Sequence, residues 1–211
     1  MTSSLHPKVI LIGGAPMIGK STLARKLAAR LEYGCLSTDD LGQAIGAVTT
    51  AQSHPALHEM AGGDYREYYV TRSVDALIAD AERRHAALWP AIAQVITAHA
   101  AWGDPVVLEG WALYPSRVAQ LALPHVASLW LVADDEVFEA RVRTAVNFYR
   151  GASDEEAMIR HFVARSQGHN GRIRKECFEH DLSVIHVAPS MAIDGIFACC
   201  LNVLKRSLEW S

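Results

Sequence analysis

The segment Gly14-Ala15-Pro16-Met17-Ile18-Gly19-Lys20-Ser21 constrains the fold of this chain more than any other. It has the G-x-x-x-x-G-K-[ST] pattern, with the apolar run 9–12 before it and a helix-like segment, 22–31, after it. A strand, a loop and a helix in this order wrap backbone N–H groups around a polyphosphate at the positive end of the helix. The sequence therefore predicts a nucleoside triphosphate site. Its expected contacts are Gly14, Ala15, Pro16, Met17, Ile18, Gly19, Lys20, Ser21 and Thr22.

Short β-branched runs alternate with helical patterns along the chain, which is typical of an α/β fold with a mainly parallel sheet. We expect strands at about 8–13, 33–37, 105–109, 127–133 and 182–187, and a last helix at about 193–208. The third and fourth strands are continuous apolar runs, as expected where helices cover both faces of a sheet. No repeat, linker or low-complexity tract divides the 211 residues, so we predict a single domain.

Two stretches do not fit a bare scaffold of strands and helices, and such excursions usually form binding loops or lids. Residues 46–70 are predicted to be irregular, and they begin a probable ligand-binding insertion at 46–103. The helix within this insertion begins near Val74, and Pro90 should kink or divide it. Residues 147–176 are predicted to form a lid.

Phosphoryl transfer needs positioned phosphates, a metal ion and a group that orients the attacking oxygen. Lys20 is expected to reach the β- and γ-phosphates, and the Ser21 hydroxyl to bind Mg²⁺. Asp39 and Asp40 end the second predicted strand, where ligands gather in parallel sheets. We assign Asp39 as the base, with metal binding through water as its alternative role, and Asp40 as a helix cap. Glu109 ends the third strand, where a second metal-organising carboxylate belongs.

Arginines are concentrated in the predicted lid. From Arg141 to Lys175 there are eight basic residues and three acidic ones, a local charge of +5 that leaves −8 for the rest of a chain of net charge −3. A helix at 154–167 would place Ile159, Phe162, Val163 and Ser166 on one face and His161 and Arg165 on the other. We expect Arg165 to serve catalysis, and Arg143 and Arg172 to contact the nucleotide. A solvated basic helix face is the alternative.

Composition excludes several other classes of protein. Half of the residues are hydrophobic, which suffices for a core, and the net charge of −3 gives no reason to expect a nucleic acid or membrane partner. The four cysteines have neither metal-site nor disulfide-framework spacing, and no apolar run is long enough to span a bilayer. The N-terminus lacks the pattern of a signal peptide. We expect a cytoplasmic location and leave the oligomeric state open, with a homodimer as one alternative.

Three segments carry a resemblance to a known family: 12–22, then Ser37-Thr38-Asp39-Asp40, then Leu108-Glu109-Gly110-Trp111. In this order they resemble the small-molecule kinases of the phosphate-loop superfamily, most of all 2-phosphoglycerate kinase and its relatives, with zeta-toxin kinases as more distant kin. The resemblance implies a P-loop NTPase fold, three-layer α/β/α with a five-stranded parallel sheet of nucleoside-kinase type. It also implies ATP with Mg²⁺ and transfer of the γ-phosphate to a small hydroxylated or phosphorylated acceptor. The segment Met17-Ile18 departs from the pattern at Met17, because such kinases often carry a small residue there, commonly Gly, followed by a small or branched one.

Two further functions were weighed against a small-molecule kinase. A nucleotide-dependent regulatory NTPase is one, although no Asn-Lys-x-Asp segment of a guanine-reading switch is present. A polynucleotide 5′-end kinase is the other, and it requires a basic groove beyond the lid, whereas the rest of the chain sums to −8. A small-molecule kinase is the interpretation that the sequence favours.

Overall fold

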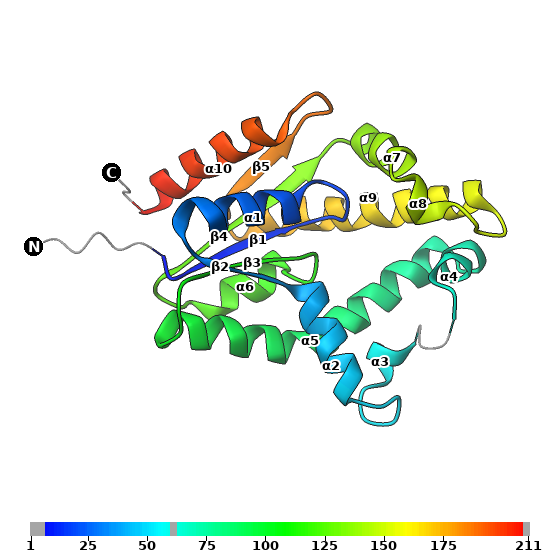
Figure 1. Cartoon of the computed structure of the whole chain (residues 1–211), viewed down its shortest axis with the longest axis horizontal. Coiled ribbons are helices and arrows are strands. Elements are labelled where there is room, and N and C mark those ends of the chain that lie inside the picture. The colour runs from blue at the N-terminus through cyan, green and yellow to red at the C-terminus, as the bar shows by residue number, and fades with distance from the viewer. Residues whose placement is uncertain (1–6, 60–62, 209–211) are drawn as a thin grey trace, which may run out of the picture.

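A five-stranded parallel sheet forms the centre of the computed structural model, which describes residues 7–59 and 63–208 (Figure 1). The strand order is β2-β3-β1-β4-β5, and every neighbouring pair is parallel. The strands are β1 (Val9–Gly14), β2 (Gly34–Ser37), β3 (Val106–Glu109), β4 (Val126–Ala133) and β5 (Val184–Val187). No bound differs by more than two residues from its predicted position, so the expected sheet is confirmed.

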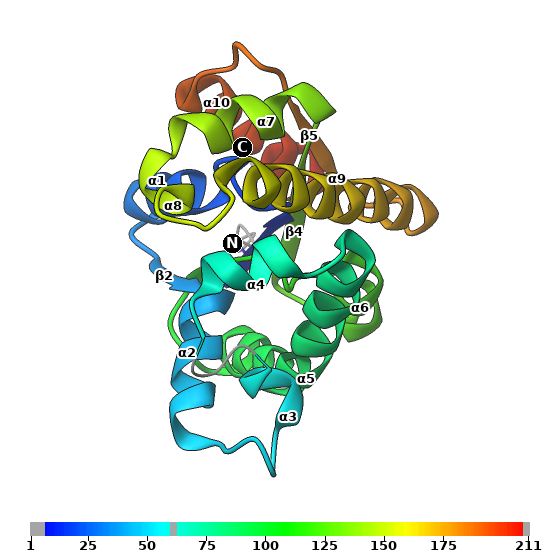
Figure 2. The same cartoon turned by 90° about the vertical axis from the view of Figure 1, so that its right-hand side faces the viewer.

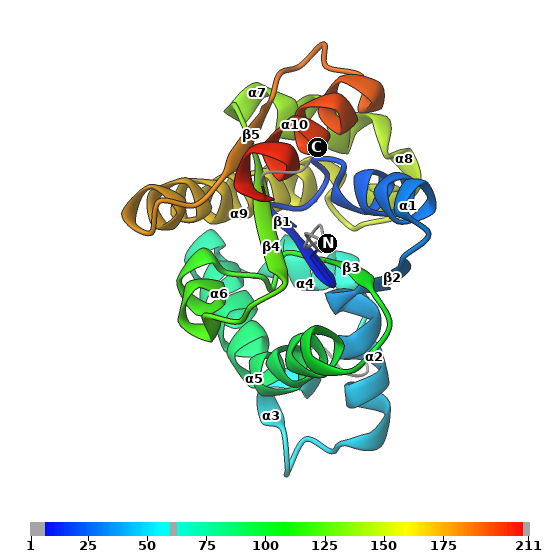
Figure 3. The same ribbon diagram turned by 90° about the vertical axis from the view of Figure 1, so that its left-hand side faces the viewer.

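Helices cover both faces of this sheet and make three layers (Figures 1 and 3). Alternate side chains of β1 point to opposite faces, so Ile10 and Ile12 join one hydrophobic core while Val9 and Leu11 join the other. The first core contains buried residues of α1 (Lys20–Leu31), α7 (Asp135–Thr144) and α10 (Ile193–Leu208). The second contains buried residues of α5 (Val74–Ala101) and α6 (Pro115–Leu121). Helix α9 (Glu155–Glu179) contributes its first half to one core and its second half to the other.

A group of helices extends beyond the sheet on the side of its carboxyl ends (Figure 2). It consists of α2 (Thr38–Val48), α3 (Pro55–His58), α4 (Tyr65–Thr71) and the first part of α5. Helix α4 packs against α9, and α8 (Val146–Tyr149) packs beside α7 and α9. None of the helices in the described ranges has the length and apolar character to cross a bilayer.

The structure corrects one local expectation and refines two others. Residues 46–70 are not mainly irregular, because α2 continues to Val48 and α3 and α4 follow; residues 60–62 lie outside the described part. Pro90 does not divide its helix, since α5 is continuous over 28 residues. The buried side chains of Leu88, Ile92 and Ile96 hold this helix against the sheet on both sides of the proline. The sequence left open whether the helix considered at 154–167 continues past Gly168 and Gly171, and α9 does continue to Glu179.

Gly110 is the position where the chain leaves β3 and crosses the start of α2. A Cβ atom there would lie 1.7 Å from Oγ1 of Thr38, which is the first residue of α2. We therefore expect Gly110→Ala to displace the start of α2 and to lower the free energy of unfolding by about 2–3 kcal/mol. Urea unfolding measures this loss.

Gly171→Ala is the matched control for this substitution. Gly171 lies inside α9, and a Cβ atom there would meet nothing within 4 Å. The change should raise the free energy of unfolding by about 0.5–1 kcal/mol, because alanine favours the helix. Equal effects of the two substitutions would contradict the close packing of Gly110 on Thr38.

Candidate active site

The loop between β1 and α1 has the geometry of a polyphosphate cradle. Gly14 has a φ of +128°, and a Cβ atom there would lie 2.3 Å from the carbonyl oxygen of Leu131. Gly19 occupies the N-cap position of α1 in a left-handed conformation, and no side chain caps the helix. The first N–H groups of α1 are therefore left for an anionic ligand.

Lys20 folds back over this loop. Its side chain is buried, and Nζ donates a hydrogen bond to the carbonyl oxygen of Ala15 at 2.7 Å. Burial lowers the pKa of Lys20 to about 8, against the opposing effect of the nearby carboxylates of Glu109 and Asp39. A buried ammonium group of this kind is stabilised by an anion, and the phosphates of a nucleotide are the ligand that the loop fits.

Met17 adopts the conformation that explains why glycine is common at its position in the resembling kinases. Its φ is +63°, in the left-handed region that side chains disfavour. The carbonyl oxygen of Met17 accepts a hydrogen bond from Nη1 of Arg141 at 3.0 Å. Arg141 thus supports the turn from α7, and sequence reasoning had not assigned it to the nucleotide site.

Ser21 and Glu109 lie in contact at the phosphate loop, at the positions where the sequence predicts a metal ion. The hydroxyl of Ser21 donates to Oε1 of Glu109 at 2.9 Å, and the Glu109 carboxylate is only 6% exposed. No ion pair of Glu109 is present among the described residues. A buried carboxylate beside a phosphate-loop hydroxyl fits Mg²⁺, which takes few protein ligands when phosphates and water supply the others. Across the described ranges, His, Cys, Asp and Glu form no group of three or more that could hold a metal by themselves.

Asp39 and Asp40 lie in the first turn of α2, and both are exposed. Oδ1 of Asp39 accepts a hydrogen bond from Nε1 of Trp111 at 2.9 Å. The predicted capping role of Asp40 was wrong, because the N-cap is Ser37, whose hydroxyl accepts from the backbone N–H of Asp39. The hydroxyl of Ser37 precedes the helix and reaches the free N–H groups of its first turn, which Asp40, inside that turn, does not.

Arg165 is a buried cation without a carboxylate partner in the described part of the chain. It is 6% exposed, and its guanidinium carbon lies 4.5 Å from the ring centre of Trp111, 4.8 Å from that of Phe162 and 5.0 Å from that of Tyr69. Burial lowers the pKa of Arg165. Its position between aromatic faces keeps its donors available for an anion.

The other two predicted arginines point elsewhere. Arg143 forms ion pairs with Glu139 and Glu156 on the surface of α7 and α9. Arg172 forms ion pairs with Glu82 and Glu176. Neither has a contact with the phosphate loop among the interactions of the described residues, so the structure does not bring them to the nucleotide site.

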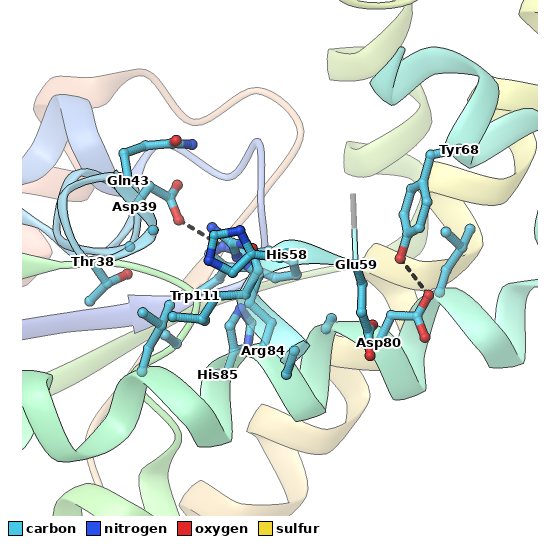
Figure 4. Close-up of a pocket in the computed structure, with 18 of the residues that line it drawn as sticks. Thr38, Asp39, Gln43, His58, Glu59, Tyr68, Asp80, Arg84, His85 and Trp111 are labelled. Carbon is cyan, nitrogen blue, oxygen red and sulfur yellow. Dashed lines mark hydrogen bonds between the residues drawn. The ribbon is translucent and has the colours of Figure 1, made fainter. Parts of the chain in front are cut away.

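Two cavities meet at this site. The smaller, of about 250 Å³, lies on the phosphate loop and is lined by residues that include Lys20, Ser21 and Glu109. The larger, of about 650 Å³, lies between α2, α3, α4 and α5 (Figure 4). Asp39, Trp111 and Arg165 line both cavities. The two cavities are therefore adjacent, and these three residues lie at their junction.

Behind Trp111, two buried histidines make stability sensitive to acid. Burial lowers the pKa of His169 to about 3, and the positive charges of Lys20, Arg165 and Arg172 lower it further. Burial also lowers the pKa of His85 well below its usual value. The unfolded chain therefore binds more protons than the native protein below about pH 6.5. Stability is retained above that pH and falls as the pH drops towards the native pKa values.

For His169 this loss should reach roughly 2 kcal/mol at pH 5 relative to pH 7. Urea unfolding at several pH values measures it. His169→Gln should flatten the pH dependence by that amount, whereas His180→Gln, at the exposed end of α9, should not. An unchanged slope in His169→Gln would mean that this imidazole is protonated in the native protein.

Comparison with known proteins places this geometry among phosphate-loop enzymes. The sequence model of a family described as isopentenyl transferase matches residues 7–160. A tRNA dimethylallyltransferase from Rhodospirillum centenum is 33% identical over 114 residues, which is 53% of this chain and 34% of the relative. A 2-phosphoglycerate kinase from Methanocaldococcus jannaschii is 30% identical over 141 residues, which is 64% of this chain and 45% of the relative. The chain thus spans less than half the length of either relative.

Solved structures support the fold. A gluconokinase from Sinorhizobium meliloti superposes with a TM-score of 0.60 at 17% identity, covering 96% of this chain and 94% of that one. A shikimate kinase from Aquifex aeolicus gives 0.54 at 15% identity, covering 95% and 98%. Together with the sheet order, these matches confirm the predicted three-layer P-loop NTPase fold.

Proposed function

This chain belongs to the isopentenyl transferase family, and we propose that it is an ATP- and Mg²⁺-dependent kinase that phosphorylates a small molecule. One observation carries this proposal above the others. Asp39, Trp111 and Arg165 line both the phosphate-loop cavity and the larger cavity beside it. Transfer of a phosphoryl group from a polyphosphate to an acceptor needs a carboxylate and a buried cation at such a junction.

In the proposed reaction the larger cavity holds the acceptor with its hydroxyl against Asp39. Asp39 accepts the hydroxyl proton as the oxygen forms a bond to the γ-phosphorus, and the bond from that phosphorus to the bridging oxygen of ADP breaks. Lys20 and Arg165 stabilise the negative charge on the transferring group. Ser21 and Glu109 would hold Mg²⁺, which supplies charge neutralisation on the phosphates when it is bound.

The larger cavity favours an acceptor that carries a negative charge. Apart from the proposed base Asp39, its acidic residues are Glu59 and Asp80, which are paired with arginines outside the cavity. Asp80 also accepts from Tyr68 at the end remote from Asp39 (Figure 4). The arginines of the cavity, Arg84 and Arg165, have no carboxylate partner among the described residues. A carboxylate or phosphate on the acceptor would pair with them, and the relatives called 2-phosphoglycerate kinase are in keeping with such an acceptor.

Unsatisfied polar atoms support the same assignment. Oγ1 of Thr38, Nε2 of His85 and Nε of Arg165 line or adjoin the cavity, are buried, and find no hydrogen-bond partner in the described part of the protein. Burying such atoms is costly unless a ligand or water satisfies them. A hydroxylated acceptor of the size of this cavity offers the groups that they lack.

The lid remains part of this proposal in a narrower form. Helix α9 packs against α4, α5, α6, α7 and β4, so the segment best suited to move is α8 with the turn before α9. This segment is tied to α4, because Tyr65 donates to the carbonyl oxygen of Phe148 at 2.7 Å and Ser153 donates to Glu67 at 2.6 Å. Closure over the nucleotide would therefore also move the wall of the acceptor cavity.

Transfer of an isoprenoid group is the second candidate. The apolar side chains of Met17, Trp111 and Phe162 line the phosphate-loop cavity beside Lys20 and could contact such a group while the loop held its diphosphate. The family description and the tRNA dimethylallyltransferase relative favour this alternative.

A screen of acceptors separates the two functions. The full chain with Mg·ATP should release ADP when one compound from a panel of phosphorylated sugars, glycerate derivatives, nucleosides and aminoglycosides is added. Parallel reactions contain dimethylallyl diphosphate with tRNA or a nucleoside monophosphate and measure diphosphate release. Diphosphate release without any acceptor-dependent ADP release would overturn the kinase proposal in favour of prenyl transfer.

A further inference from the structure

We infer that Trp111 is the positioning residue that sets the geometry of the transfer site by fixing Asp39 with its indole N–H and Arg165 with its ring. This inference rests on the proposed function, because it assigns Trp111 a role in the same reaction. Trp111 is the side chain that touches both charged groups at the junction of the two cavities.

The backbone before Trp111 fixes the position of this residue next to α2. Gly110 passes so close to Thr38 that a Cβ atom would overlap its side chain, which fixes the chain at the end of β3 against the first turn of α2. The next residue, Trp111, therefore lies over Asp39, the second residue of α2. Its Nε1 donates to Oδ1 of Asp39 at 2.9 Å although the two residues are 72 positions apart in the chain.

Trp111 is itself held from behind by buried rings. The imidazole of His85 meets the indole edge to face, with ring centres 4.1 Å apart and an interplanar angle of 87°. The ring of His169 lies 5.9 Å from it. His85 is fixed in turn by Nδ1, which lies 3.2 Å from the hydroxyl oxygen of Tyr114. Because His85, His169 and Tyr114 are buried in the body of the protein, they restrict the orientation of the half-buried indole.

The hydrogen bond leaves one oxygen of Asp39 for chemistry. Oδ1 is occupied by the indole N–H, and the Asp39 carboxylate has no other side-chain partner among the described residues. Oδ2 is then free to accept the proton of an acceptor hydroxyl. An exposed aspartate at the start of a helix would otherwise sample several rotamers, so the indole restricts the base to one orientation.

The same ring orients the cation. The guanidinium carbon of Arg165 lies over Trp111 at 4.5 Å from the ring centre, in a cation–π contact, and Arg165 lines both cavities. Asp39 and Arg165 are thus both positioned by contacts with the same side chain, Trp111. Two groups positioned by one ring keep their separation, which transfer between them requires.

Trp111→Phe tests the inference, because it keeps the ring and removes the N–H donor. We expect the turnover number to fall by about 10–100-fold while the KM for ATP changes by less than about twofold. Trp102→Phe, at a position that is 81% exposed, is the matched control and should behave as the wild type. A Trp111→Phe enzyme with wild-type turnover would overturn the inference.

A double variant separates positioning from packing. If Trp111 acts through Asp39, then Trp111→Phe should cause no further loss when added to Asp39→Asn, within about twofold. If the indole only fills space, Trp111→Phe should reduce the turnover number by the same factor in the wild type and in Asp39→Asn. That result would overturn the inference.

The contact between Trp111 and Asp39 can also be tested by a measurement that does not depend on enzymatic activity. The chain has five tryptophans, and the indole N–H signal of Trp111 in a ¹H–¹⁵N spectrum is identified by its loss in Trp111→Phe. That signal should shift in Asp39→Asn and stay in place in Asp40→Asn. A shift in a protein that phosphorylates nothing would leave the contact standing and remove the kinase proposal. An unshifted signal would remove the contact itself.

Discussion

Lys20→Met is expected to reduce ATP-dependent transfer by at least about 10³-fold. Methionine retains the length and apolar part of the lysine side chain and removes the charge that the phosphates would contact. Binding of Mg·ATP, measured by calorimetry, should weaken with it. Transfer at the wild-type rate in this variant would remove the phosphate-loop assignment on which the proposed function depends.

The same variant should be more stable than the wild type in the absence of nucleotide. Lys20 is buried and its pKa is lowered to about 8, which shows that its charged form is poorly solvated in the folded protein. Replacing it should raise the free energy of unfolding by about 1–3 kcal/mol. Lys26→Met is the matched control on the same helix, since Lys26 is exposed and pairs with Asp194 on α10. That variant should retain both transfer and nucleotide binding.

Patterns confined to a short stretch of sequence predicted most of the scaffold. The strands β1, β3 and β4 could be predicted because each is a compact apolar run that needs no distant partner to be recognised. The phosphate loop could be predicted because a backbone that wraps around a phosphate needs its glycines and lysine at fixed intervals in the sequence. The last helix, Ile193–Leu208, was found for the same local reason, the periodicity of its apolar residues.

The errors arose where tertiary packing outweighs local preference. Pro90 removes one helical hydrogen bond, yet the burial of Leu88, Ile92 and Ile96 keeps α5 continuous. Helices α3 and α4 are too short, at four and seven residues, to show a period in sequence. Local chemistry misled only at Asp40, where the nearer cap residue was Ser37.

The missed site residues depend on long-range contacts that no spacing rule contains. Arg141 reaches the carbonyl oxygen of Met17 across 124 positions, and Trp111 reaches Asp39 across 72. Trp111 had a signal, because it directly follows Leu108-Glu109-Gly110 at the end of a strand. Arg143 was selected for its charge, and Arg172 for its charge and its helical phase with Arg165. Each pairs with a glutamate four positions away in its helix, which spacing could have indicated, and with a distant one, Glu156 or Glu82, which it could not.

Asp39→Asn should separate binding from chemistry. The amide keeps the shape of the carboxylate but is a far weaker proton acceptor, so we expect transfer to fall by about 10²–10⁴-fold. The affinity for Mg·ATP should stay within a few-fold of the wild type, because the phosphates are held by the loop and by Lys20 rather than by Asp39. Rapid-quench measurement of a single turnover, together with calorimetry, distinguishes the two effects.

Asp40→Asn is the internal control for this result. Asp40 is the next residue in the same turn of α2, is also exposed and makes no hydrogen bond to Trp111 among the contacts of the described residues. Its replacement should leave transfer unchanged, because the indole selects Asp39 alone. Should Asp40→Asn be the damaging change, the base would be Asp40, and the hydrogen bond from Trp111 would hold Asp39 away from the acceptor rather than towards it.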